Sequence, residues 1–358
     1  MTTLIRKAAV TVLAVGAGLA ATSNATAATR IEGAGATFPN PIYQRWVTEY
    51  QRSHPDVQIN YQSIGSGGGI KGIINKTVDF AGSDAPMSKS ELGQAGSPVV
   101  HIPTVAGGLV PAYNLPGFQG ELKLDGQTLA GIYMGTISTW NDPAIAALNE
   151  GSRLPSTPIT PAWRTDGSGS TFVFTNYLAT QSEEFKSTVG AGKSVEWPAG
   201  QGGKGSEGVA AIIQQTPGAI GYVELNYATQ NKLRYASVKN QAGKFVKASP
   251  ETVSAAGEAA LKQMNNGIAD IWNQPGDNAY PIAAYTYVIV YQDLGAIKDR
   301  NKARALVDFL TWATGEQGQR FAGEMDYAPL APGVRQKVTE QLNKLTFGGN
   351  RLGVAAAR

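Results

Sequence analysis

The chain has 358 residues, 42% of them hydrophobic and 16% charged, and its formal net charge is +3. This composition excludes a disordered chain and a strongly basic nucleic-acid-binding protein. The length exceeds what one hydrophobic core usually serves, so two lobes are expected. Cysteine is absent, which excludes disulfides, thiolate chemistry and a lipoprotein-type acceptor cysteine.

The beginning of the chain has the pattern of a secretory signal peptide. Arg6 and Lys7 precede an apolar run over residues 8–21, and small residues continue to Ala27. The run is shorter than the roughly 20 residues that span a bilayer. We therefore predict a signal peptide at residues 1–27, cleaved near Ala27, and a mature protein that is exported to the periplasm without a lipid anchor.

The next segments repeat the order strand, glycine-rich loop, helix. The pattern predicts strands from Ile31, over 57–64 and over 78–82, each followed by a loop and a helix. This order is typical of an α/β protein with largely parallel sheets. Loops at the carboxyl ends of such strands gather at one edge, where ligands bind.

Two apolar runs, Val99–Tyr113 and Pro281–Tyr291, predict strands that cross between the lobes. The remaining elements follow from periodicity. Helices are predicted at Leu129–Trp140, Phe172–Leu178, Ala303–Thr314 and Val334–Leu345, strands at Ile159–Trp163 and Ala219–Val223, and a polar surface excursion at Lys232–Gly257.

The stretch Arg164–Thr171 predicts an anion-binding loop. It places one fixed cation and a row of glycine and hydroxyl residues directly before a helix, and a helix N-terminus attracts phosphate-like anions. An ordinary loop capped by Asp166 is the alternative. Three further loops carry similar residues, namely Thr37 with Phe38, Ser66 and Asp84, and four such loops in one α/β chain favour anion binding.

None of the motifs in the sequence indicates an enzyme. G-x-G-x-x-G occurs three times in this glycine-rich chain, so each match is uninformative, and neither a Walker pattern nor a G-x-S-x-G motif is present. His54 and His101 are the only histidines, and no metal-ligand spacing exists. We expect a protein that is not an enzyme and needs no cofactor.

Six motifs resemble the periplasmic phosphate-binding proteins of ABC phosphate importers. They are Gly33–Pro39, Ile64–Ser66, Asp79–Pro86, Arg164–Gly169, Gly218–Tyr222 and Met325–Ala328. The resemblance covers essentially all of the mature chain. It implies a two-lobe periplasmic-binding-protein fold, type II-like, in which each lobe is a mixed, mostly parallel sheet flanked by helices and two hinge crossovers join the lobes. Lobe one would comprise residues 28–106 plus 283–358, and lobe two residues 107–282.

The resemblance also implies how inorganic phosphate is held. Lobe one would supply the Thr37 hydroxyl, the Phe38 amide and the hydroxyl and amide of Ser66. Lobe two would supply the guanidinium of Arg164, oriented by Asp166, and donors from Ser168, Gly169 and Ser170. Ser170 departs from the family pattern, which has threonine there, but the hydroxyl is kept. Lys71 and Lys204 match no ligand position and are predicted to be solvated.

Asp84 is the residue that the resemblance makes responsible for selectivity. An ionised carboxylate only accepts hydrogen bonds. Phosphate near neutral pH still carries a proton to donate, whereas sulfate does not. The cost of a buried, unpaired charge predicts discrimination of about 10³ or more. The alternative interpretation of Asp84 is a helix cap before Ala85–Pro86.

These observations predict an extracytoplasmic receptor that closes over phosphate and delivers it to the permease subunits of an ABC importer. Its expected partners are phosphate and the permease, with no nucleic acid, and we expect a monomer. The alternatives are a receptor for another tetrahedral oxyanion, such as sulfate or molybdate, and a secreted phosphatase or adhesive protein on the same fold.

Overall fold

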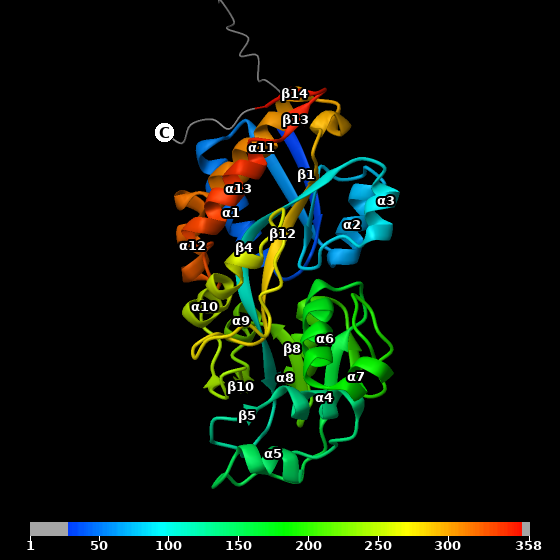
Figure 1. Cartoon of the computed structure of the whole chain (residues 1–358), viewed down its shortest axis with the longest axis vertical. Coiled ribbons are helices and arrows are strands. Elements are labelled where there is room, and N and C mark those ends of the chain that lie inside the picture. Colours follow the sequence, from blue (N-terminus) through cyan, green and yellow to red (C-terminus); the bar gives the residue numbers. More distant parts are fainter. Residues whose placement is uncertain (1–27, 353–358) are drawn as a thin grey trace, which may run out of the picture.

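The computed structural model describes residues 28–352. The predicted signal peptide at residues 1–27 lies outside the described residues, as does the end of the chain from residue 353. The described part is elongated and has two lobes, one above the other in Figure 1. None of the helices in residues 28–352 combines the length and the hydropathy needed to cross a membrane.

A continuous nine-stranded sheet runs through both lobes. Its order is β2-β1-β3-β12-β4-β8-β6-β7, with β9 paired to β4. In lobe one, β1 pairs in parallel with β2 and β3, and in lobe two β6 pairs in parallel with β7 and β8. The strands are β1 (Thr29–Gly35), β2 (Val57–Ser63), β3 (Phe80–Ser83), β4 (Val99–Tyr113), β6 (Thr160–Arg164), β7 (Gln201–Gly203), β8 (Ala219–Glu224), β9 (Arg234–Tyr235) and β12 (Ala283–Tyr291).

The long strand β4 connects the lobes. Its first part pairs antiparallel with β12, from Val99 to Gly108, and its last part pairs antiparallel with β8, from Leu109 to Tyr113. Both apolar runs that predicted crossovers are therefore strands, and both pass from one lobe to the other in Figure 1. The two-lobe α/β fold with mixed sheets is confirmed. The sheets are not mostly parallel, because the nine-stranded sheet has four parallel strand pairs and four antiparallel pairs, the latter all involving β4 or β12. The residue boundaries of the lobes stay a prediction.

Helices cover both faces of the sheet in lobe one. α1 illustrates why, because Ile42, Trp46, Val47 and Tyr50 recur at helical spacing and all four are buried. The helices of this lobe are α1 (Asn40–Ser53), α2 (Ser66–Ile74), α3 (Lys89–Ala95), the 3₁₀ turn η2 (Leu294–Ile297), α11 (Arg300–Thr314), α12 (Glu316–Glu324) and α13 (Pro332–Leu342), and the hairpin β13 (Thr346–Phe347) and β14 (Asn350–Arg351) follows.

Lobe two contains less β-sheet than lobe one and more short helices and strands. Aromatic packing holds α6 on the sheet, where the Phe174 ring stacks on Tyr222 with centroids 4.5 Å apart. The elements are α4 (Gly126–Met134), α5 (Pro143–Leu148), α6 (Gly169–Gln181), α7 (Glu183–Thr188), α8 (Gly205–Gln215), α9 (Leu225–Gln230), α10 (Pro250–Ala260), η1 (Leu261–Gln263) and the small sheet of β5 (Lys123–Leu124), β10 (Ser237–Lys239) and β11 (Phe245–Val246).

Two predicted segments differ from the structure. The helix expected to reach Trp140 ends at Met134, because Gly135 adopts a left-handed conformation with φ of 78° and caps it. The segment Lys232–Gly257 is not only a surface excursion, since it contains β9–β11 and the start of α10, with Val238 and Val253 buried. Strands of two or three residues are too short to show periodicity in a sequence.

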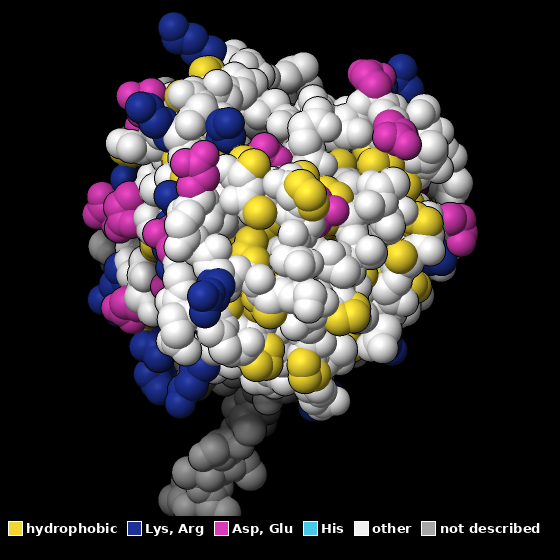
Figure 2. Space-filling view, turned by 90° about the horizontal axis from the view of Figure 1, so that it is seen from below, with side chains coloured by type: hydrophobic (Ala, Val, Ile, Leu, Met, Phe, Trp, Pro, Cys, Tyr) yellow, Lys and Arg dark blue, Asp and Glu magenta, His cyan; other side chains and the backbone are white. Residues whose placement is uncertain are grey.

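Charges of both signs are interspersed on the outer end of lobe two. Figure 2 shows this face from below, with Lys and Arg beside Asp and Glu at its edges and hydrophobic side chains scattered between uncharged ones. This mixture agrees with the small formal net charge of +3 for 30 basic and 27 acidic residues. Charge on this face therefore does not mark a single-sign binding surface.

Candidate functional site

Polar side chains from both lobes meet in a buried cluster where the carboxyl ends of the parallel strands face each other. Buried polar groups are normally hydrogen-bonded to one another or to a ligand, so a dense cluster between the lobes is a candidate binding site. Its members are at most 5% exposed: Thr37, Ser66, Asp84, Arg164, Ser168, Ser170, Ser206, Glu224 and Thr286.

Helix N-termini converge on this cluster from both lobes. Thr37 lies just before α1 and Ser66 is the first residue of α2, while Ser168 caps α6 and Gly205 begins α8. The amide groups at such ends have no partners within their own helix and carry a partial positive charge. The cluster is therefore suited to an anion.

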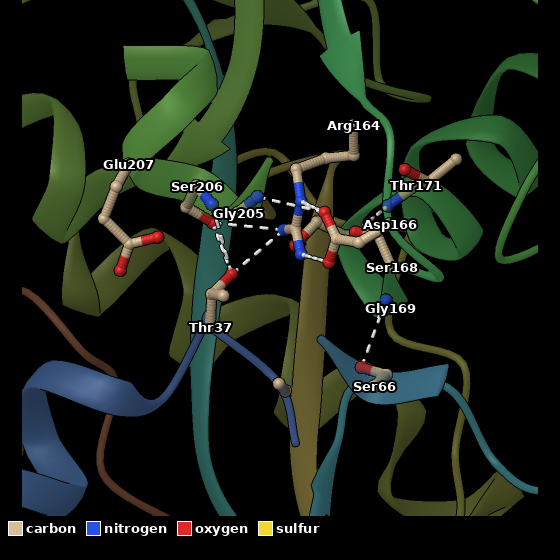
Figure 3. Close-up of polar contacts among 12 residues, drawn as sticks. Thr37, Ser66, Arg164, Asp166, Ser168, Gly169, Thr171, Gly205, Ser206 and Glu207 are labelled. Atoms are coloured by element: carbon tan, nitrogen blue, oxygen red, sulfur yellow. Dashed lines mark hydrogen bonds and ion pairs between the residues drawn. The ribbon is translucent and has the colours of Figure 1, made fainter. Parts of the chain in front are cut away.

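Arg164, the last residue of β6, supplies the fixed cation (Figure 3). Its Nε donates to Asp166 Oδ1 at 2.8 Å, and Nη2 donates to Oδ2. Its Nη1 donates to Thr37 Oγ1 at 3.0 Å and to Ser206 Oγ at 3.3 Å. Although burial opposes the charge, the Asp166 ion pair keeps the pKa of Arg164 above its ordinary value, so the guanidinium is charged and oriented.

Asp166 orients the Arg164 guanidinium through two hydrogen bonds. Its Oδ1 also accepts from the Gly205 amide at 3.0 Å. These hydrogen bonds and the Arg164 charge hold the pKa of Asp166 below its ordinary value despite partial burial. Asp166 thus links the loop after β6 to the start of α8.

Thr37 and Phe38 bring the loop after β1 to the site. The Thr37 hydroxyl lies 2.8 Å from Ser206 Oγ, and the Thr37 carbonyl accepts from Tyr227 Oη at 2.8 Å. The Phe38 ring is fully buried and its carbonyl accepts from Tyr327 Oη at 2.6 Å. The ring anchors the loop in the core, which leaves the backbone of Phe38 at the edge of the site.

The lobes touch directly at Ser66 and Gly169. The Gly169 amide donates to Ser66 Oγ at 3.1 Å (Figure 3), and the Gly67 amide donates to the Gly167 carbonyl at 2.8 Å. A Cβ on Gly169 would lie 2.5 Å from Asp84 Oδ2 and from Ser66 Oγ. Only glycine fits here when the lobes are together.

Asp84 follows β3 and is almost completely buried. Thr286 Oγ1 donates to its Oδ1 at 2.8 Å, and Ser66 Oγ lies 3.4 Å from its Oδ2. Burial and the nearby carboxylate of Glu224 raise the pKa of Asp84 to about 7, against the opposing effect of the Thr286 hydrogen bond. The carboxyl therefore changes its charge near neutral pH.

Ser168 and Ser170 have partners within lobe two. Ser168 Oγ accepts from the Thr171 amide at 3.1 Å as the N-cap of α6, and the Ser168 amide donates to the Lys193 carbonyl at 2.9 Å. Ser170 Oγ lies 2.5 Å from Glu224 Oε1. A hydroxyl that accepts one hydrogen bond can still donate another, so the Ser168 hydrogen remains available to a ligand, whereas Ser170 Oγ is placed to donate its hydrogen to Glu224.

A model of the PBP superfamily domain matches residues 20–317 of the chain. The phosphate-binding protein PstS of Pasteurella multocida is 46% identical over 318 residues, which cover 88% of this chain and 90% of that protein. The chain belongs to the family of PstS phosphate-binding proteins. PstS of Haemophilus influenzae is 45% identical over 318 residues, covering 88% of this chain and 92% of that protein.

A phosphate-binding protein of known structure has the same fold as this PstS family member. The high-affinity periplasmic phosphate-binding protein PfluDING, bound with phosphate, matches with a TM-score of 0.69 and 23% identity, covering 91% of this chain and 96% of that one. At this identity the likeness concerns the fold alone. It supports the two-lobe architecture.

Three buried residues of the site were not predicted: Ser206, Glu224 and Thr286. Ser206 follows Gly205 as the second residue of α8, much as Ser66 follows Gly65 at the start of α2, so a signal was present. Thr286 lies in the middle of the crossover strand β12, where nothing local marks it. Glu224 is the last residue of the buried strand β8, beside the end of β6. A charged residue at the end of a buried strand is the only feature of the sequence that could have indicated it.

Residues predicted to lie outside the site do so. Lys71 and Lys204 are exposed. His101 is 5% exposed and its Nε2 accepts from the Met87 amide at 3.0 Å, as expected of a structural histidine. Within residues 28–352, His, Asp and Glu side chains form no cluster of three or more that could hold a metal ion.

Proposed function

We propose that this protein is an extracytoplasmic receptor that binds inorganic phosphate between its lobes and releases it to the permease of an ABC importer. The observation that carries the proposal is the buried cluster in which one oriented guanidinium, several hydroxyls and four helix starts from both lobes converge. Membership of a family whose relatives are named phosphate-binding proteins supports the choice of phosphate.

The residue roles follow from the chemistry of each group. Arg164 supplies the charge, held in place by Asp166. Thr37, Ser66, Ser168 and Ser170 donate from hydroxyls, and the amides of Phe38 and Gly169 donate from the backbone. Asp84 accepts the proton that phosphate retains and repels a fully ionised anion. No bond is made or broken, and release requires only that the lobes reopen.

The wider setting is part of the same proposal. The protein acts in the periplasm after removal of a signal peptide, as a monomer without a lipid anchor, and its partners are phosphate and the permease. It is not an enzyme and carries no cofactor. A receptor for sulfate is disfavoured by Asp84, because a buried ionised carboxylate leaves that anion without a proton to share.

The test is calorimetric titration of the mature protein, stripped of bound ligand, with phosphate and with sulfate. Phosphate should bind and sulfate should bind far more weakly. Arg164→Ala should weaken phosphate binding by about 10-fold to 100-fold, the value of a charged hydrogen bond. Unchanged phosphate affinity in this variant would refute the site assignment, and hydrolysis of a phosphomonoester by the purified protein would revive the phosphatase alternative.

A further inference from the structure

Glu224 is a second buried carboxyl group at the phosphate site, and it comes from the lobe opposite Asp84. It is the last residue of β8, whose parallel neighbour β6 ends at Arg164. Carboxyl ends of parallel neighbours lie at the same sheet edge, so the two side chains enter the cluster together. Glu224 is 1% exposed.

The two carboxyl oxygens of Glu224 have different surroundings. Oε1 lies 2.5 Å from Ser170 Oγ, whereas the buried Oε2 has no hydrogen-bond partner among the described residues. An ionised carboxylate would bury charge on an oxygen without a donor, which is costly. A neutral carboxyl group fits these surroundings better. Its O–H group can lie at Oε1, and its carbonyl oxygen, a weaker acceptor than a carboxylate oxygen, can lie at Oε2.

The proton on Glu224 determines what Ser170 can do. A serine hydroxyl has one hydrogen to donate. If Glu224 is ionised, Ser170 must donate this hydrogen to Oε1. If Glu224 is neutral, it donates to Ser170 Oγ, and the Ser170 hydrogen is free. Ser170 is the second residue of α6, next to Gly169, which contacts Ser66 of the other lobe.

We propose that Glu224 is a proton-holding positioning residue of the phosphate site: its neutral form donates to Ser170 Oγ and leaves the Ser170 hydrogen for a phosphate oxygen. The inference rests on the proposed function. When Glu224 is ionised in the ligand-free protein, phosphate binding draws one proton from the buffer onto Glu224. No other bond changes.

The charged groups around Glu224 act in opposite directions. Burial raises the pKa of Glu224 above its ordinary value, while the Ser170 hydroxyl, the Arg164 charge from β6 and the Ser206 hydroxyl from α8 oppose this rise. Asp84, from the loop after β3, repels the ionised form, and the phenols of Tyr227 on α9 and Tyr327 beyond α12 also feel the Glu224 charge. A phosphate anion adds negative charge and favours the neutral form further.

The experiment compares the wild type with Glu224→Gln, whose amide donates to Ser170 permanently. Phosphate is titrated by calorimetry across the neutral and alkaline range, in pairs of buffers that differ in ionisation enthalpy, so that affinity and proton uptake are both measured. In the wild type, the proton uptake that accompanies phosphate binding should increase as pH rises. Glu224→Gln should not show this increase. Its phosphate affinity should also fall less steeply with pH.

Ser170→Ala provides the second arm. It should weaken phosphate binding by about 3-fold to 10-fold, the value of a neutral hydrogen bond. In the Ser170→Ala background, Glu224→Gln should change the slope of affinity against pH less than in the wild type, because the part of the coupling that passes through the Ser170 hydrogen is lost while the repulsion between the Glu224 charge and phosphate remains. Glu183→Gln is the matched control, since it removes an exposed carboxylate of the same lobe, and should behave as the wild type.

The outcomes separate the two proposals. Proton uptake and a pH profile in Glu224→Gln equal to those of the wild type would overturn the inference while leaving phosphate binding intact. If Glu224→Gln does not fold by circular dichroism, an unchanged phosphate affinity in Ser170→Ala overturns it instead. A wild type that binds no phosphate would refute the proposed function itself.

Discussion

Among single residues, Asp84 is a buried carboxyl group whose pKa lies near neutral pH. Its raised pKa of about 7 results from burial and from the neighbouring Glu224. Below that pKa the carboxyl is neutral and can donate a hydrogen bond to a fully ionised anion. Above it the carboxylate only accepts. Selectivity for a protonated anion should therefore depend on pH.

We predict that discrimination against sulfate increases with pH. Sulfate has no proton to offer, so its binding requires the neutral form of Asp84 and weakens by up to about tenfold for each pH unit above the pKa. Phosphate retains a proton across this range and loses less. Titrations of both anions at a series of pH values measure the ratio of the two dissociation constants.

Asp84→Asn is the control for this prediction. The amide keeps an oxygen for Thr286 and a donor for the anion, but it does not titrate. Discrimination should be lower than in the wild type and independent of pH beyond the titration of phosphate itself. A variant that discriminates as the wild type does at every pH would show that Asp84 does not select the anion.

At the scale of secondary-structure elements, the start of α6 shows how closely the lobes approach. Gly169 is the first residue of the helix, and an added Cβ would meet Asp84 and Ser66 of lobe one at 2.5 Å. These atoms belong to buried, hydrogen-bonded side chains that have little room to move. The glycine is therefore required by closure and not by the helix itself.

We predict that Gly169→Ala weakens phosphate binding by at least about tenfold, because the closed arrangement that surrounds the ligand is blocked. The free energy of unfolding without ligand should change by less than about 1 kcal/mol, since alanine favours a helix more than glycine does. Phosphate titration and thermal unfolding measure the two effects. Gly323→Ala in α12, where a Cβ meets nothing within 4 Å, should leave phosphate affinity unchanged.

At the scale of the whole molecule, an ion pair spans the two lobes beside the site. Lys193 Nζ of lobe two lies 2.6 Å from Glu91 Oε1 of lobe one, and both side chains are 21% exposed. Glu91 Oε2 also accepts from the Ser88 amide in the capping box of α3. Although burial opposes it, the Lys193 hydrogen bond lowers the pKa of Glu91, so the pair is intact at neutral pH and is lost as pH falls through that pKa.

We predict that Lys193→Gln weakens phosphate binding by up to about fivefold at low salt, with a smaller effect at high salt, because a partly exposed ion pair contributes at most about 1 kcal/mol. Lys186→Gln is the matched control. Its partner Glu183 lies in the same helix, so its removal does not affect closure. Equal effects of the two substitutions on phosphate affinity would contradict a role for the interlobe pair.

Local patterns in the sequence were enough to predict the fold class and much of the candidate site. Helical and strand periodicity report local burial, so α1, the parallel strands and both crossovers were predictable from chain-local patterns. The loops at Thr37, Ser66 and Arg164 were visible for the same reason, because hydroxyls and glycines stand next to a helix start.

Which distant groups meet became visible only in the folded chain. Thr286 donates to Asp84 across 202 positions of the chain, and Ser206 reaches Thr37 across 169. Such contacts depend on the order of strands in the sheet, which leaves no mark on either residue. The pKa of Asp84 and the pairing of Glu224 with Ser170 have the same origin, since burial and neighbouring charge exist only once the two lobes lie together.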